Sequence, residues 1–102
     1  MAMKPSIFLT LLLFTFINST RAQTWEELNS KAIEYYNAGK YEQAIELELL
    51  AVEKIRNELG ENHPDYATIL NNLAEFYRTS SNYEKAEPLY QEAIKIKKEI
   101  LG

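Results

Sequence analysis

The feature that most constrains this chain is an internal repeat with a period of 42 residues. Residues 28–60 align with residues 70–102 without a gap, and eleven of the thirty-three positions are identical. The shared residues are mostly small or aromatic: Leu28/Leu70, Asn29/Asn71, Ala32/Ala74, Tyr35/Tyr77, Tyr41/Tyr83, Glu42/Glu84, Ala44/Ala86, Leu47/Leu89, Ala51/Ala93, Leu59/Leu101 and Gly60/Gly102. Because one such unit cannot bury its apolar side alone, the repeat predicts an architecture in which the two units pack on each other.

The second copy predicts two helices. Its apolar residues recur at helical spacing along one face, and Pro64 suits the first turn of that helix. Residues 79–82 break the pattern, and Asn82 is a good N-cap for a further helix that begins at Tyr83. Pro88 falls inside this last helix, which we expect to continue unbroken with a slight bend.

The first copy predicts the same pair. Thr24 and Glu27 have the spacing of a capping box at the start of its first helix. Residues 38–40 interrupt the pattern, and the second helix is expected over about 41–59, with Gly60 as its C-cap. No segment alternates with a period of two, so the sequence predicts an all-α fold without strands.

These positions resemble the tetratricopeptide repeat signature, in its longer, kinesin-light-chain-like form. The resemblance covers about residues 25–102 and is carried by the linker-like segment 59–67, by 71–74, by 83–90, and by Leu70, Leu73, Ala74, Tyr77, Ala86, Tyr90 and Ala93. It implies two helix-turn-helix repeats, at about 25–60 and 67–102, in a short right-handed α-solenoid that occupies residues 23–102. It also implies that the chain holds another protein or a peptide.

Residues 1–22 are predicted to be an export signal. Lys4 precedes an apolar run from Ile7 to Ile17, which is about half the length needed to cross a membrane. Small residues at Thr20 and Ala22 favour cleavage before Gln23, and the remaining chain is expected in the periplasm or outside the cell. An N-terminal anchor or a buried helix is the less favoured alternative.

Composition excludes several kinds of partner and cofactor. Removing residues 1–22 leaves nine basic and fifteen acidic residues, a net charge of −6, which opposes binding to nucleic acid. We expect no membrane partner after the signal is cleaved. The absence of cysteine excludes disulfides and thiolate metal sites. We therefore expect no cofactor and no metal.

Packing between the helices should follow the repeated small and aromatic residues. Ala32, Ala44, Ala74 and Ala86 are expected where helices approach closely, and Tyr35, Tyr41, Tyr77 and Tyr83 where they diverge. Lys31 and Glu48 stand where the second copy has Leu73 and Tyr90. Because a lone buried charge is costly, we expect both positions to be exposed or locally rearranged.

The candidate peptide-binding residues come from the first helix of each repeat. The resemblance places these helices on the concave surface, where the inward positions are inferred to be Asn29, Ile33, Tyr36, Asn71, Glu75 and Arg78. Asn29 and Asn71 occupy the same repeat position. They either form a ladder that holds a peptide backbone or bond to adjacent helices and support the stack.

No catalytic constellation stands out, and we expect no enzymatic activity. His63 beside Asp65 is better interpreted as a linker residue at a helix start than as a general base. Lys95, Lys97 and Lys98 suit a helix C-terminus, where cations favour the dipole.

Two functions remain open at this point. One is an exported, non-catalytic interaction module. The other is the N-terminal part of a larger exported protein, with a separate domain beyond residue 102, such as a caspase-like protease. The last helix is expected to expose Ile94, Ile100 and Leu101, which further repeats or a homodimer would cover.

Overall fold

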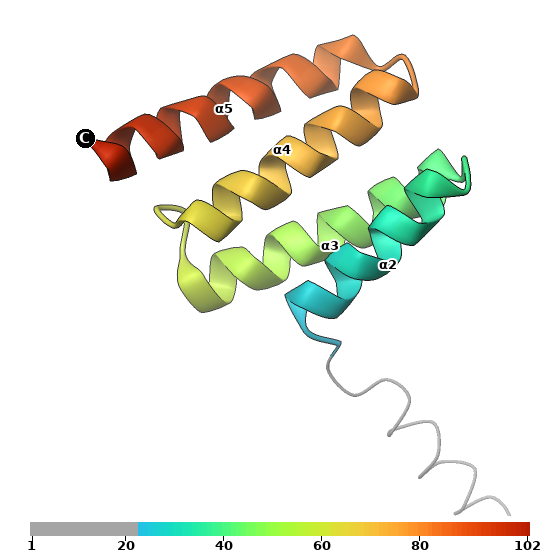
Figure 1. Ribbon diagram of the computed structural model, residues 1–102, viewed down its shortest axis with the longest axis horizontal. Helices are drawn as coiled ribbons and strands as arrows, with labels where there is room; N and C mark the ends of the chain where they lie inside the picture. The colour runs from blue at the N-terminus through green and yellow to red at the C-terminus, as the bar shows by residue number, and fades with distance from the viewer. Residues whose placement is uncertain (1–22) are drawn as a thin grey trace, which may run out of the picture.

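The computed structural model describes residues 23–102, which form four α-helices in two antiparallel pairs (Figure 1). The helices are α2 (Trp25–Asn37), α3 (Tyr41–Leu59), α4 (Pro64–Thr79) and α5 (Tyr83–Leu101). The pair α2/α3 is the first repeat and the pair α4/α5 is the second, with α4 packed on α3. The all-α prediction is confirmed, whereas the predicted export signal lies outside the described residues.

Helix starts in both repeats follow the capping residues that the sequence indicated. The Thr24 hydroxyl accepts from the backbone N–H of Glu27 at 3.1 Å, and the Glu27 carboxylate accepts from the Thr24 N–H at 3.0 Å. These bonds from Thr24 lower the pKa of Glu27. Pro64 occupies the first turn of α4, where a missing N–H is harmless. The Asn82 side chain accepts from the Lys85 N–H at the start of α5.

Two features of the longer helices also agree with the sequence. α3 ends at Leu59 and Gly60 is its C-cap, with a φ of +84° that glycine adopts at low cost. α5 runs unbroken through Pro88.

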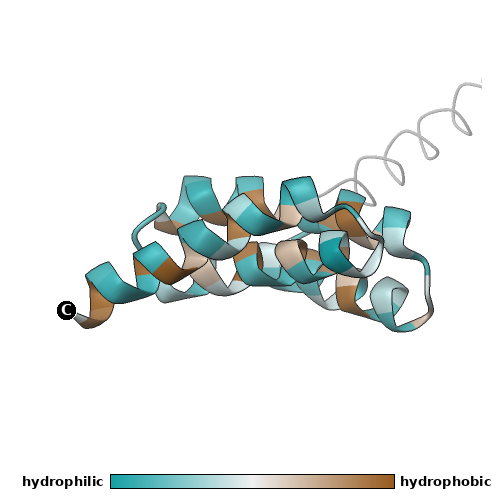
Figure 2. Ribbon diagram, turned by 90° about the horizontal axis from the view of Figure 1, so that it is seen from above, coloured by the Kyte–Doolittle hydropathy of each residue, from teal (hydrophilic) through white to brown (hydrophobic). Residues whose placement is uncertain are grey.

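The core lies between the two pairs and extends along α3 and α4. The four repeated alanines are buried, which lets the helices of each pair approach closely. Tyr77 is buried and Tyr35 and Tyr41 are partly buried, but Tyr83 is 62 % exposed, so the expectation that it fills the interior is wrong. Tyr83 is the first residue of α5 and lies directly after the turn that joins α4 to α5. Figure 2 shows apolar and polar segments on each helix, as this arrangement requires.

The two ends of the stack differ in polarity. Lys31 on α2 is exposed, as expected, and its equivalent Leu73 is only 2 % exposed because α4 packs on α3. At the other end, Ile94 and Leu101 of α5 are exposed, as expected. Ile100 is instead partly buried and packs against the core cluster, so its predicted exposure is wrong. It lies on the side of α5 that faces the core.

The turn between α4 and α5 contains a strained residue, Ser81. Ser81 has a φ of +69°, while its repeat equivalent Gly39 has a φ of +78°. The left-handed conformation costs a residue with a Cβ on the order of 1 kcal/mol, which glycine avoids. Glycine also makes the unfolded chain more flexible, and this offsets part of the gain in stability. Ser81→Gly is therefore expected to raise the melting temperature by a few degrees, about 0.5–1 kcal/mol. The matched change Ser80→Gly, at a φ of −85°, should not stabilise the protein. Equal melting temperatures for Ser81→Gly and the unmodified chain would contradict the strain argument.

Candidate functional site

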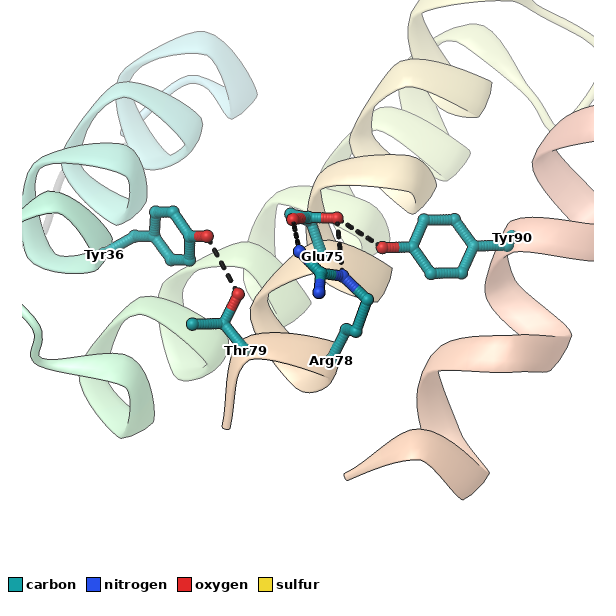
Figure 3. Close-up of polar contacts among 5 residues, drawn as sticks. All are labelled: Tyr36, Glu75, Arg78, Thr79 and Tyr90. Carbon is teal, nitrogen blue, oxygen red and sulfur yellow. Dashed lines mark hydrogen bonds and ion pairs between the residues drawn. The ribbon is translucent and has the colours of Figure 1, made fainter. Parts of the chain in front are cut away.

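The six candidate binding residues lie on α2 and α4, the first helices of the two repeats, and side-chain contacts join these helices. The Tyr36 hydroxyl and the Thr79 hydroxyl oxygen are 2.9 Å apart (Figure 3). The Tyr36 ring stacks on Phe76 with centroids 4.7 Å apart and planes at 24°. The Asn72 amide nitrogen lies 3.2 Å from the side-chain oxygen of Asn29. These contacts make one surface across both repeats.

The structure divides the six candidates into two groups. Ile33, Asn71 and Arg78 are exposed, and Arg78 keeps 52 % of its side-chain surface in solvent. Three others are partly buried and are already bonded within the protein: Asn29, Tyr36 and Glu75. The exposed three are the side chains most available to a ligand, and they belong to both repeats.

Arg78 is held in a fixed orientation by Glu75 and Tyr90 (Figure 3). The Glu75 carboxylate accepts two bonds from the Arg78 guanidinium, one from Nε at 3.2 Å, and a third bond from the Tyr90 hydroxyl. The bonds from Arg78, and then from Tyr90, lower the pKa of Glu75, so this carboxylate stays ionised at neutral pH. Burial, and then the bond to Glu75, raises the pKa of the Tyr90 phenol.

This arrangement determines what Arg78 can do. A guanidinium has five N–H donors in a rigid plane, and only part of that set is used by Glu75. The remaining donors belong to a side chain that is 52 % exposed, so they can bind a carbonyl or carboxylate oxygen of a ligand. Tyr90 was not among the predicted site residues, although its place in the α5 stripe beside α4 was visible in the sequence.

The two asparagines that share a repeat position have different roles. Asn71 is exposed, as a peptide-binding residue should be. Asn29 lies against Asn72 and Glu48, so it supports the stack. Of the two alternatives for these asparagines, the supporting role fits Asn29, while Asn71 stays a candidate for binding a peptide backbone.

Glu48 is the residue that the sequence interpretation placed wrongly. We expected it to be exposed or rearranged, but it is completely buried on α3. Removal from water raises its pKa to about 8, an effect that a hydrogen bond from Asn72 reduces. The proton is what makes burial tolerable, because a neutral carboxyl loses far less hydration than a carboxylate. Its helical spacing from the buried residues Ala44, Ala51 and Ile55 was the signal for burial.

The Asn29 amide can satisfy Glu48 in either protonation state. With its nitrogen turned toward Glu48, Asn29 donates to the two carboxylate oxygens at 2.9 and 3.1 Å. With the amide turned by 180°, its oxygen faces the same carboxyl and accepts from the Asn72 nitrogen. A protonated Glu48 needs such an acceptor. In residues 23–102, no buried side-chain nitrogen or oxygen lacks a partner.

His63 caps the N-terminus of α4. Its Nδ1 atom accepts from the backbone N–H of Asp65 at 3.0 Å, which makes it the N-cap of that helix. The Asp65 carboxylate is 3.9 Å from the same nitrogen. Within the described part of the chain, no three acidic or histidine side chains are grouped as a metal site. None of the helices α2 to α5 is long and apolar enough to cross a membrane.

Comparison with known proteins agrees with the fold and the repeat. A family model described as the tetratricopeptide repeat matches residues 21–99. No curated protein matches the sequence significantly. The family match spans all four helices almost completely, and the same segment shows the 42-residue internal repeat. The chain belongs to the tetratricopeptide repeat family.

Proposed function

We propose that this chain is an exported, non-catalytic module that binds an extended segment of another protein across α2 and α4. Tetratricopeptide repeats suggest a protein–protein interaction module. The observation that carries the proposal is the continuous surface of α2 and α4, on which three exposed candidates lie: Ile33, Asn71 and Arg78.

The three side chains suggest the chemistry of the bound segment. Ile33, which is 37 % exposed, offers an apolar contact. Asn71 offers both a donor and an acceptor to a peptide backbone, and Arg78 offers N–H donors to a carbonyl or carboxylate. A peptide with an apolar side chain near α2 and an acidic side chain near α4 would fit this surface best. Nucleic acid and anionic membranes fit it poorly, because the chain is acidic.

The proposed export rests on the pattern in residues 1–22. If it is correct, the intact mass and N-terminal sequence of secreted protein start at Gln23. Cell-retained protein that still carries Met1 would contradict it.

A second candidate is that the module is the N-terminal part of a larger exported protein, whose separate domain, such as a caspase-like protease, would lie beyond residue 102. The exposed Ile94 and Leu101 on α5 favour some further packing partner. Reading the encoding DNA downstream of Gly102 distinguishes the two candidates.

Replacing both exposed polar residues tests the binding surface. The double variant Asn71→Ala/Arg78→Ala is expected to bind a captured peptide partner at least about tenfold more weakly, because truncating interface arginines often costs 1–2 kcal/mol or more. Binding is measured by isothermal titration, and circular dichroism should show unchanged helicity. The control Asn57→Ala/Lys95→Ala removes the same kinds of group from α3 and α5. If Asn57→Ala/Lys95→Ala weakens binding and Asn71→Ala/Arg78→Ala does not, the peptide binds to a surface other than that of α2 and α4.

A further inference from the structure

The outer side of α5 carries a second candidate surface, which is separate from α2 and α4. The repeat supplies a direct comparison, because α3 and α5 are equivalent helices and, within residues 23–102, only α3 has another helix packed on that side. Val52 on α3 is 6 % exposed, whereas its equivalent Ile94 on α5 is 54 % exposed. The same helix position is therefore covered in the first repeat and open in the second.

The open side of α5 is shaped as two adjoining shallow grooves that share Ile94 and Lys98. Figure 2 shows apolar ribbon in the last turn of α5, and Leu101 there is 85 % exposed. Lysines border the apolar residues, and together the two grooves are lined by Gln91, Ile94, Lys95, Lys97, Lys98, Glu99, Leu101 and Gly102.

Lys97 determines what can cover this face. It stands at the position of Ile55, which is completely buried in one core cluster with Ile69 and Leu73 of α4. A helix packed on α5 as α4 packs on α3 would remove the Lys97 ammonium from water. That loss is costly unless a carboxylate faces the ammonium. A helix whose packing side is wholly apolar at this position, as that of α4 is, is therefore a poor occupant.

The neighbouring position adds to this requirement. Lys98 is equivalent to Arg56, which donates to the Tyr66 hydroxyl at 3.1 Å and pairs with Glu61 at 3.1 Å. Both partners of Arg56 lie at the start of the second repeat. The basic residue at this position of α3 therefore contacts the start of α4, the helix packed on α3. Lys98 can contact an acidic or phenolic group at the start of a helix packed on α5 in the same way.

A second copy of the chain is a poor occupant of the same face. In a two-fold dimer with antiparallel α5 helices, Ile94 of each copy would approach Leu101 of the other. Lys97 and Lys98, midway between them, would then lie beside their own copies at the axis. Like charges at such close range are destabilising.

We propose that the outer face of α5 binds an amphipathic helix of a partner protein, whose apolar side carries a carboxylate opposite Lys97. Ile94 and Leu101 supply the apolar contact and Lys97 supplies the specificity. This surface does not include Asn71 or Arg78, so the two binding activities are separable.

The test uses helical peptides that copy residues 62–79, each held helical by a lactam bridge on its solvent side. One peptide is unchanged and two carry a single substitution, Ile69→Glu or Leu73→Glu. At least one acidic peptide is expected to bind the chain about tenfold more tightly than the unchanged peptide, as measured by fluorescence anisotropy. Lys97→Ile should reverse this preference, and Lys97→Glu should abolish binding of the acidic peptides.

Two control variants keep the interpretation clear. Lys31→Glu changes an exposed lysine on α2, and Asn71→Ala/Arg78→Ala changes the other proposed surface, so both should leave the peptide preference unaltered. The proposal is overturned if all three peptides bind equally, or if none binds at millimolar concentration. It is also overturned if sedimentation shows that the chain dimerises through α5 and that Lys97→Glu dissociates the dimer.

Discussion

At pH 8, the Glu48→Gln protein is expected to be more stable than the unmodified chain by roughly 2–4 kcal/mol. Glutamine has nearly the same shape as glutamate and cannot ionise. It keeps the contacts with Asn29 and Asn72 and removes the requirement that a proton stay bound. Chemical denaturation at pH 5 and pH 8 measures the effect.

The direction of this pH dependence follows from the pKa of Glu48. Burial raises the pKa from 4.5 to about 8, so between these values the folded protein binds more protons than the unfolded chain. The free energy of unfolding therefore falls as pH rises from about 5 to 8. Glu27 and Glu75 have lowered pKa values, so their stabilising contribution is lost only as pH falls below this window.

The matched control is Glu46→Gln, which removes an exposed carboxylate two residues away on the same helix. It should leave the loss of stability between pH 5 and 8 unchanged, while Glu48→Gln should remove most of it. If the unmodified chain shows no loss of stability over this range, Glu48 is not held protonated by burial.

Leu73→Ala is expected to destabilise the protein by about 2–5 kcal/mol, the usual cost of removing a large core side chain. Leu73 is 2 % exposed and lies in the core cluster shared by α3, α4 and α5. A domain of this size has a total stability of only about 4–12 kcal/mol. The variant should therefore be substantially unfolded at 37 °C, as judged by thermal melting followed by circular dichroism.

The repeat provides the control for this change. Lys31→Ala alters the equivalent position of α2, where the side chain is exposed, and should change stability by less than about 0.5 kcal/mol. Similar effects of the two substitutions would contradict the conclusion that α4 is an internal helix and α2 an outer one.

The sequence alone predicted the helices and most of their ends, because these depend on local chemistry. Thr24 with Glu27, Pro64 and Gly60 act within a few residues of their own positions, and the structure places each as expected. The repeat also indicated which small residues are buried, since Ala32 and Ala74 align in phase.

The remaining features depend on contacts between distant residues. The burial of Glu48 requires polar partners from α2 and α4, and no local pattern states that Asn29 and Asn72 meet there. The orientation of Arg78 likewise depends on a distant residue, because Tyr90 on α5 donates a hydrogen bond to the Glu75 carboxylate that binds Arg78. In the sequence Glu48 stands as a lone charge among apolar positions, whereas in the structure Asn29 and Asn72 lie against it.

The most direct test of the account is to map a bound peptide onto the chain by NMR. A peptide is selected from a random library for binding and kept only if Lys97→Glu leaves its affinity unchanged, and it is then titrated into the ¹⁵N-labelled protein. We predict that the largest shifts fall on exposed residues of α2 and α4, including Ile33, Asn71 and Arg78. In Asn71→Ala/Arg78→Ala, these shifts should need at least about tenfold more peptide to reach half of their maximum. Shifts confined to α3 and α5, with α2 and α4 unchanged, would contradict the claim that the first helices of the two repeats form the binding surface.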